Sequence, residues 1–138
     1  MGGFEVLDHT ADLRLVAHGK DLPDALAWIA TGMFSVIADL DAVATRDAMR
    51  VSITSTDREA LVVDWLNELL FRYETEGFLP RCFEVTVNDA GTALEARCAG
   101  EPADPARHRT SPLEKAATYH ALEVKHGREW RIQVVLDV

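Results

Sequence analysis

The sequence is poor in cysteine and in long apolar runs, and both shortages exclude whole classes of protein. Its two cysteines, Cys82 and Cys98, lie far apart and form no C-x-x-C motif. This usage predicts buried, reduced thiols and argues against a disulfide framework, a cysteine-rich zinc site and a redox function. No segment approaches the roughly 20 consecutive apolar residues of a membrane span, and the N-terminus does not resemble a signal peptide. We therefore expect a cytoplasmic protein that makes no contact with membranes.

Positive charge and clustered glycines are also scarce. The chain has 14 Lys and Arg against 23 Asp and Glu, which gives a formal charge of −9. An acidic chain repels phosphate backbones, so any role with nucleic acids is expected to be indirect. Its glycines form no phosphate-binding loop, and no serine lies in the sequence context of a nucleophile. Nucleotide binding and nucleophilic catalysis by this chain alone are therefore disfavoured.

Apolar residues are abundant enough for one core. The chain has 138 residues, of which 48% are hydrophobic. A chain of this size and composition can bury a core without disulfides or a structural metal. We therefore predict a single domain over residues 1–138.

Helical periodicity occurs twice. Apolar side chains repeat at three- and four-residue steps over residues 22–39, directly after Asp21, a candidate N-cap. A second helix is expected to begin after Thr56 or Asp57 and to end before Gly77. Its apolar side chains, which we expect in the core, include Leu61, Trp65, Leu69 and Phe71.

Alternating apolar residues predict strands in the rest of the chain. The expected strands lie near residues 4–6, 13–17, 49–53, 83–87, 94–98, 122–124 and 130–136. Turn residues at 88–91 and 126–128 indicate two hairpins, and residues 100–112, rich in proline and charge, indicate a long loop. We predict an α+β fold in which largely antiparallel β-sheet packs with two amphipathic α-helices; a doubly wound α/β fold is the alternative.

Polar clusters interrupt the predicted strands. They are His9-Thr10-Ala11-Asp12, then Glu101 with Asp104 and His108, and then Lys115 with Thr118-Tyr119-His120. A carboxylate among apolar strand residues costs desolvation energy unless it is paired or binds a cation. If the last strand lies beside the first, Asp137 and the terminal carboxylate of Val138 come close to Asp12. Oxygen donors alone favour calcium, magnesium or manganese; in the alternative, Asp12 caps a turn and Asp137 is solvated.

Histidine and lysine allow further interpretations. His9, His108 and His120 could join Asp12 or Glu101 as ligands of zinc or a transition metal, although their spacing is irregular. A partly buried, hydrogen-bonded histidine is the simpler explanation of each. Lys115 could bind a phosphate or a carboxylate of a partner, or it could simply be solvated.

Several motifs together resemble one family. They are F-E-V-L-D-H-T-A-D from Phe4, D-W-L-N-E-L-L from Asp64, Gly100-Glu101 with Asp104 and His108, K-A-A-T-Y-H from Lys115, and the final L-D-V. In this order they resemble the archease family over nearly the whole chain. The resemblance implies an accessory protein that activates RtcB-type RNA ligases, the GTP- and metal-dependent enzymes of tRNA splicing and RNA repair. Such an activator promotes guanylylation of the ligase and multiple turnover.

The resemblance also implies a set of partners and site residues. The ligase would be a transient partner, and tRNA would be contacted only through it. A divalent metal ion, usually calcium, would be held by Asp12, Asp137 and Val138. Lys115 would be a second functional residue, and the weaker candidates are His9, Glu101, His108 and His120. At Ala117 the sequence departs from the bulkier residue that is frequent in the family, which affects packing only.

Two other functions remain open at this stage. Asp12, His108 and His120 could surround an activated water in a metal-dependent hydrolase. Alternatively, an exposed apolar patch could bind other proteins, as in a chaperone or an assembly module.

Overall fold

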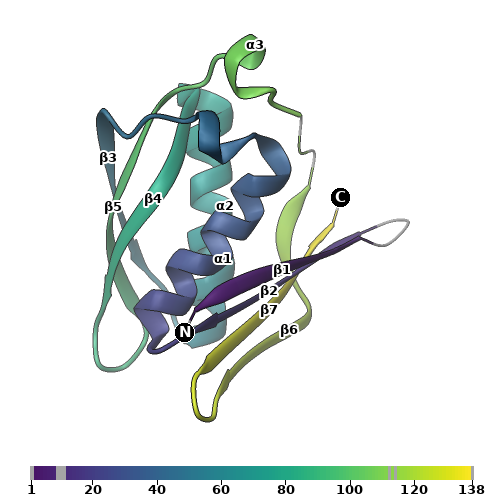
Figure 1. Ribbon diagram of the computed structural model, residues 1–138. Coiled ribbons are helices and arrows are strands. Elements are labelled where there is room, and N and C mark those ends of the chain that lie inside the picture. The colour runs from purple at the N-terminus through teal and green to yellow at the C-terminus, as the bar shows by residue number, and fades with distance from the viewer. Residues whose placement is uncertain (1, 9–11, 112, 114, 138) are drawn as a thin grey trace.

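Two antiparallel sheets enclose a pair of helices in the computed structural model, which describes residues 2–8, 12–111, 113 and 115–137 (Figure 1). The first sheet has the order β1-β2-β7-β6 and the second the order β3-β5-β4. The strands of the first sheet are β1 (Gly3–Asp8), β2 (Leu13–Gly19), β6 (Ala116–His126) and β7 (Trp130–Asp137). Those of the second are β3 (Asp47–Thr54), β4 (Phe78–Val87) and β5 (Ala93–Pro102).

The strand pairing confirms the predicted fold class. Every strand pair within the described residues is antiparallel, and β2 and β7 occupy the centre of the four-stranded sheet. A doubly wound fold needs parallel strands joined by helical crossovers, so that alternative is wrong. The strands nearest the two ends of the described chain, β1 and β7, therefore lie in the same sheet, and β2 lies between them.

Local sequence signals determine the ends of the two long helices, α1 (Leu22–Ile37) and α2 (Arg58–Glu76). At the start of α1 the carboxylate of Asp21 accepts a hydrogen bond of 2.8 Å from the backbone N–H of Asp24. At the start of α2 the carboxylate of Asp57 accepts a hydrogen bond of 2.8 Å from the backbone N–H of Ala60. Asp57 is therefore the N-cap and Thr56 is not. Gly77 ends α2 with φ of 68°, a left-handed conformation that glycine adopts without a steric penalty.

The helices connect the two sheets. α1 packs on both β2 and β4, whereas α2 packs on β6 and also contacts β3 and β4. Trp65 of α2 is fully buried, and its indole N–H donates a 2.9 Å hydrogen bond to the carbonyl of Leu26 in α1. A buried indole needs such a partner, so this bond ties the helices together inside the core.

Three predictions differ from the structure. The expected loop at residues 100–112 is partly ordered, because β5 continues to Pro102 and a single helical turn, α3 (Pro105–His108), follows. Phe71, expected in the core, is 57% exposed, because it follows Leu70 by one helical step and so faces away from the core. Cys82 is exposed on β4, whereas Cys98 is buried as predicted, and burial raises the pKa of the Cys98 thiol to about 12.

One further element completes the described chain. A 3-10 helix, η1 (Leu40–Ala42), follows α1 and lies against α3. No helix in the described ranges is long and apolar enough to cross a membrane.

Candidate functional site

The register of the central strands brings three candidate residues to one end of a sheet. Leu13 pairs with Leu136, so Asp12 and Asp137 each lie one residue beyond this pair, on neighbouring strands. Ala116 pairs with Asp137, so Lys115, directly before β6, lies at the same end. Figure 1 shows the start of β6 and the end of β7 side by side. We call Asp12, Lys115 and Asp137 the β2–β7 end.

The β2–β7 end is a suitable place for a hard cation. Directly opposite residues on antiparallel strands have Cβ atoms about 5 Å apart, and two like charges at that separation repel. Asp12 and Asp137 are both half-buried. Their carboxylate oxygens are donors of the kind that calcium or magnesium prefers. Val138, the third predicted metal ligand, and His9, a weaker functional candidate, lie outside the described residues.

Asn67 of α2 fixes the strand that follows Lys115. Its side-chain N–H donates to the carbonyl of Ala117 at 3.1 Å, and its side-chain oxygen accepts from the N–H of Ala117 at 2.8 Å. The backbone N–H and carbonyl of Ala117 on the free edge of β6 therefore form hydrogen bonds with a side chain instead of with a further strand. The sequence contained a signal for this role, an amide within the apolar stretch of α2, but its partner on β6 could not be inferred.

Glu101 of β5 and His108 of α3 form a buried pair. Their exposed fractions are 1% and 0%. The Nδ1 atom of His108 accepts from the backbone N–H of Asp104 at 2.8 Å, so the ring proton is on Nε2 and is donated to Glu101 Oε2, also at 2.8 Å. Both ring nitrogens are thus used within the fold.

Three more donors surround the Glu101 carboxylate. Arg107 Nη1 and the backbone N–H of Ala44 lie 2.8 Å and 2.9 Å from Oε2, and Arg46 Nε lies 3.0 Å from Oε1. The hydrogen bond from Arg107 is the main reason why the pKa of Glu101 lies well below its usual range, followed by those from Ala44 and His108. These contacts attach α3 to β5 and to the segment after η1, so Glu101 and His108 act inside the fold.

His120 lies on an irregular part of β6. It is exposed, as is Tyr119, and the pairing with β7 shifts between Thr118 and Glu123, where Ala121 has φ of 53°. Among the residues that the structure places, no three or more His, Cys, Asp or Glu side chains are grouped to hold a metal ion. Asp12, His108 and His120 therefore do not form the metal cluster that the hydrolase hypothesis needs.

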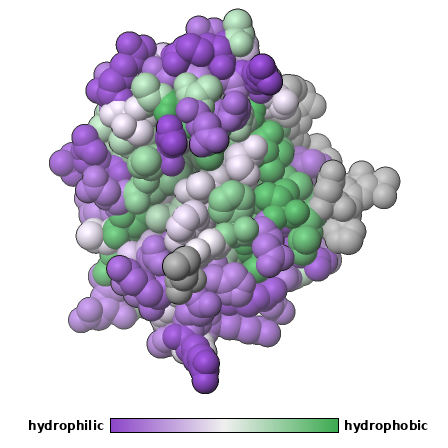
Figure 2. Space-filling view, viewed as in Figure 1, coloured by the Kyte–Doolittle hydropathy of each residue, from purple (hydrophilic) through white to green (hydrophobic). Residues whose placement is uncertain are grey.

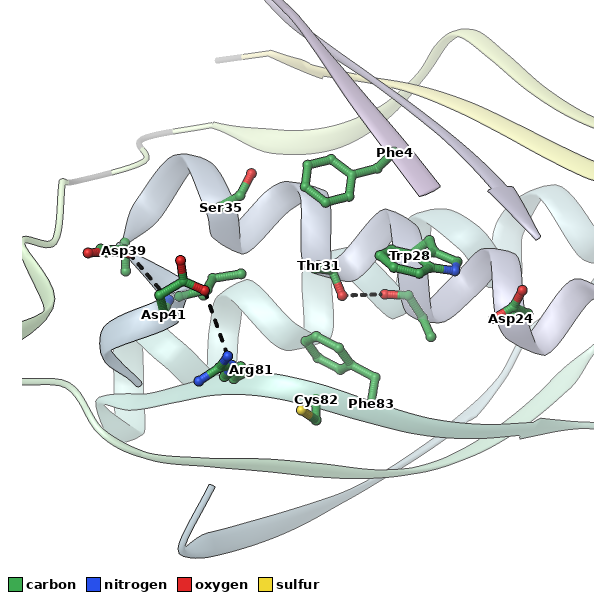
Figure 3. Close-up of a pocket in the computed structure, with 13 residues that line it drawn as sticks. Phe4, Asp24, Trp28, Thr31, Ser35, Asp39, Asp41, Arg81, Cys82 and Phe83 are labelled. Atoms are coloured by element: carbon green, nitrogen blue, oxygen red, sulfur yellow. Dashed lines mark hydrogen bonds and ion pairs between the residues drawn. The ribbon is translucent and has the colours of Figure 1, made fainter. Parts of the chain in front are cut away.

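A groove along α1 is a feature that the sequence did not predict. The cavity has a volume of about 830 Å³ and lies between the edge strands β1 and β4 (Figure 3). We call it the α1 groove; its lining includes Phe4, Asp24, Trp28, Thr31, Ser35, Asp39, Asp41, Arg81, Cys82 and Phe83. These residues come from β1, from α1 and the η1 segment that follows it, and from β4, so no local pattern in the sequence indicates the groove.

The chain is similar to known proteins over nearly its whole length. Residues 4–138 match the archease protein family. The chain is 35% identical to the protein archease of Methanosarcina acetivorans over 139 residues, covering 98% of this chain and 95% of that protein. It is 39% identical to the protein archease of Methanothermobacter thermautotrophicus over 126 residues, covering 90% and 89%.

Solved structures share the fold. The solution structure of Methanobacterium thermoautotrophicum protein 1598 has a TM-score of 0.80 and 33% sequence identity, and the match covers 99% of both chains. The crystal structure of an archease from Thermotoga maritima has a TM-score of 0.64 and covers 96% of this chain and 94% of that one. Its sequence identity is 17%, so this second likeness concerns the fold alone.

Proposed function

Because the chain belongs to the archease family, we propose that it activates an RtcB-type RNA ligase in tRNA splicing and RNA repair. The activator promotes guanylylation of the ligase and allows repeated turnover, and it performs no ligation itself. The ligase is its transient partner in the cytoplasm. The formal charge of −9 supports contact with RNA only through the ligase.

One observation carries the proposal. The pairing of β7 with both β2 and β6 aligns Asp12, Lys115 and Asp137 at the end of a single sheet. Asp12 and Asp137 would hold a divalent cation, calcium by preference, with Val138, outside the described residues, as a further oxygen donor. A cation bound there would neutralise the two carboxylates and offer a coordination position to an anionic group of the partner.

The three residues of the β2–β7 end also position the site and provide a group that can bind the partner. Asp12 directly precedes β2 and Asp137 ends β7, and these two central strands are fixed by neighbours on both sides. Lys115 adds a cationic group that can bind a phosphate or a carboxylate. To activate the ligase, this end must bind the guanylylation-competent state of the ligase more tightly than the resting state.

A multiple-turnover ligation assay with the cognate ligase tests the activator role. We expect Asp12→Ala to reduce the stimulation by about tenfold or more, equivalent to about 1.4 kcal/mol of coupling. Asp89→Ala is the matched control, because Asp89 is an exposed carboxylate in the β4–β5 turn. Full stimulation by a folded Asp12→Ala protein would refute the proposal.

Calorimetric titration with calcium tests the metal separately. The wild-type protein should bind calcium, and Asp137→Asn should weaken binding at least tenfold while its thermal unfolding midpoint changes little. If the wild-type protein binds neither calcium, magnesium nor manganese yet still stimulates the ligase, the metal component is wrong and the activator role stands.

A further inference from the structure

The α1 groove exposes one face of a helix between two free sheet edges. β1 pairs with β2 alone and β4 with β5 alone among the described strands. Side chains of α1 at three- and four-residue steps line the floor, among them Asp24, Trp28, Thr31 and Ser35 (Figure 3). The opposite face of α1 is buried against β2 and β4, so this face is the part of the helix that the fold leaves uncovered.

The walls and floor of the groove are aromatic. Phe4 of β1 and Trp28 of α1 have ring centroids 6.3 Å apart, and Phe83 of β4 lies on the other wall. All three rings are only partly buried. Figure 2 shows apolar surface between hydrophilic regions on the side of the molecule where α1 faces the viewer in Figure 1. Large apolar groups of a ligand would therefore find partners along the groove.

The charge of the groove indicates the chemistry of its occupant. Three carboxylates line it, those of Asp24, Asp39 and Asp41, against the single guanidinium of Arg81. Arg81 donates to the carbonyl of Val43 at 3.0 Å and lies 3.7 Å from Asp41, so it offsets one of the three carboxylates and the groove keeps an excess of negative charge. A nucleic acid or a second copy of this acidic chain would be repelled, whereas a cationic ligand would be attracted.

We propose that the α1 groove binds a protein segment that carries large apolar side chains flanked by Arg or Lys. The apolar side chains pack on Phe4, Trp28 and Phe83, and the cationic side chains meet the carboxylates of the rim. The site is separate from the β2–β7 end and goes beyond the proposed activator role. It is a docking surface for a basic segment of a protein partner.

Cys82, exposed on β4 beside Phe83 of the groove wall, provides a probe at the rim of the groove. Cys98 is buried, so alkylation of the native protein reports on Cys82. The test uses a synthetic amphipathic peptide with Leu and Arg at helical spacing. One control peptide has Glu in place of every Arg, and another has Ser in place of every Leu. We expect saturable protection of Cys82 by the Leu/Arg peptide, with at least tenfold weaker protection by either control.

A pair of matched variants locates the binding site. Thr31 and Thr75 each donate to the backbone carbonyl four residues earlier in their own helix, at 2.9 Å and 2.7 Å, but Thr31 lines the groove and Thr75 lies on α2. Thr31→Arg should reduce the affinity for the Leu/Arg peptide at least tenfold, because it narrows the groove and adds a like charge. Thr75→Arg should leave the affinity unchanged.

Four results would overturn the proposal. If the Glu peptide protects Cys82 as well as the Leu/Arg peptide does, apolar binding is unselective; if the Ser peptide does so, charge attraction alone is responsible. The third result is that no peptide protects Cys82. The fourth is that Thr31→Arg and Thr75→Arg bind the Leu/Arg peptide with the same affinity.

Discussion

Glu101 shows how one carboxylate can organise a segment that has no periodic pattern. Its folded-state pKa is lowered, so its contribution to stability is complete above the ordinary glutamate pKa of about 4.3 and is lost as the pH falls further. We expect the urea midpoint of the wild-type protein to fall between about pH 5 and pH 3. Glu101→Gln should lower the midpoint at neutral pH and flatten this acid decline.

Glu95→Gln provides the control for this pH series, because Glu95 is an exposed carboxylate on the same strand, β5. It should leave both the midpoint and its acid decline close to those of the wild type. A Glu101→Gln protein with the wild-type pH profile would show that the Arg107 and His108 contacts do not stabilise the fold.

Asn67 is a second single residue with a structural role, because its side chain holds Ala117 of β6 in place. Asn67→Ala removes two hydrogen bonds and leaves the N–H and the carbonyl of Ala117 without these partners, so we expect a loss of about 1–3 kcal/mol in the free energy of unfolding. Amide exchange at Ala117 should become faster. Glu74→Ala, at an exposed position of the same helix, should change neither quantity; an unchanged exchange rate in Asn67→Ala would contradict the positioning role.

Some residues could be predicted and others could not, for physical reasons. Asp21 and Asp57 act through neighbours three residues away, so their capping roles are local and visible in the sequence. Glu101 accepts from Ala44, which is 57 positions distant, and no local pattern encodes that contact. Cys82 is expected to be buried because of its residue type, but it precedes the inward-facing Phe83 on β4, so strand alternation places it on the exposed face.

At the scale of elements, the start of α2 offers a direct comparison of the two capping candidates. Asp57→Ala removes the bond to the N–H of Ala60 and should lower the free energy of unfolding by about 1 kcal/mol. Thr56→Ala should have almost no effect, because Asp57 is the residue that caps the helix. Chemical denaturation of both variants measures the difference, and equal losses would contradict the assignment.

Element types were more predictable than their meeting points. Periodicity of 3.6 and of two residues identified both long helices and the hairpins around residues 88–91 and 126–128. The proximity of Asp12 to Asp137 was a hypothesis about tertiary structure, and it required the pairing of β2 with β7 that the register supplies. The α1 groove depends on four elements at once, β1, α1, η1 and β4, so it could be found only in the fold.

At the scale of the whole molecule, the helices make the two sheets interdependent. α1 packs on β2 of one sheet and on β4 of the other, and Trp65 joins α2 to α1. We therefore expect a single cooperative unfolding transition, with the same midpoint from far-ultraviolet circular dichroism and from tryptophan fluorescence. Two separated midpoints would show that one sheet is stable without the other.

The central position of β7 has a consequence for biosynthesis. β7 follows the other strands of its sheet in the chain, yet it lies between β2 and β6. A nascent polypeptide emerging from the ribosome therefore presents β2 with an unmatched side until translation reaches β7. A premature stop codon before Trp130 would leave two strands with exposed backbone donors and acceptors, a state that cellular quality control would be expected to degrade.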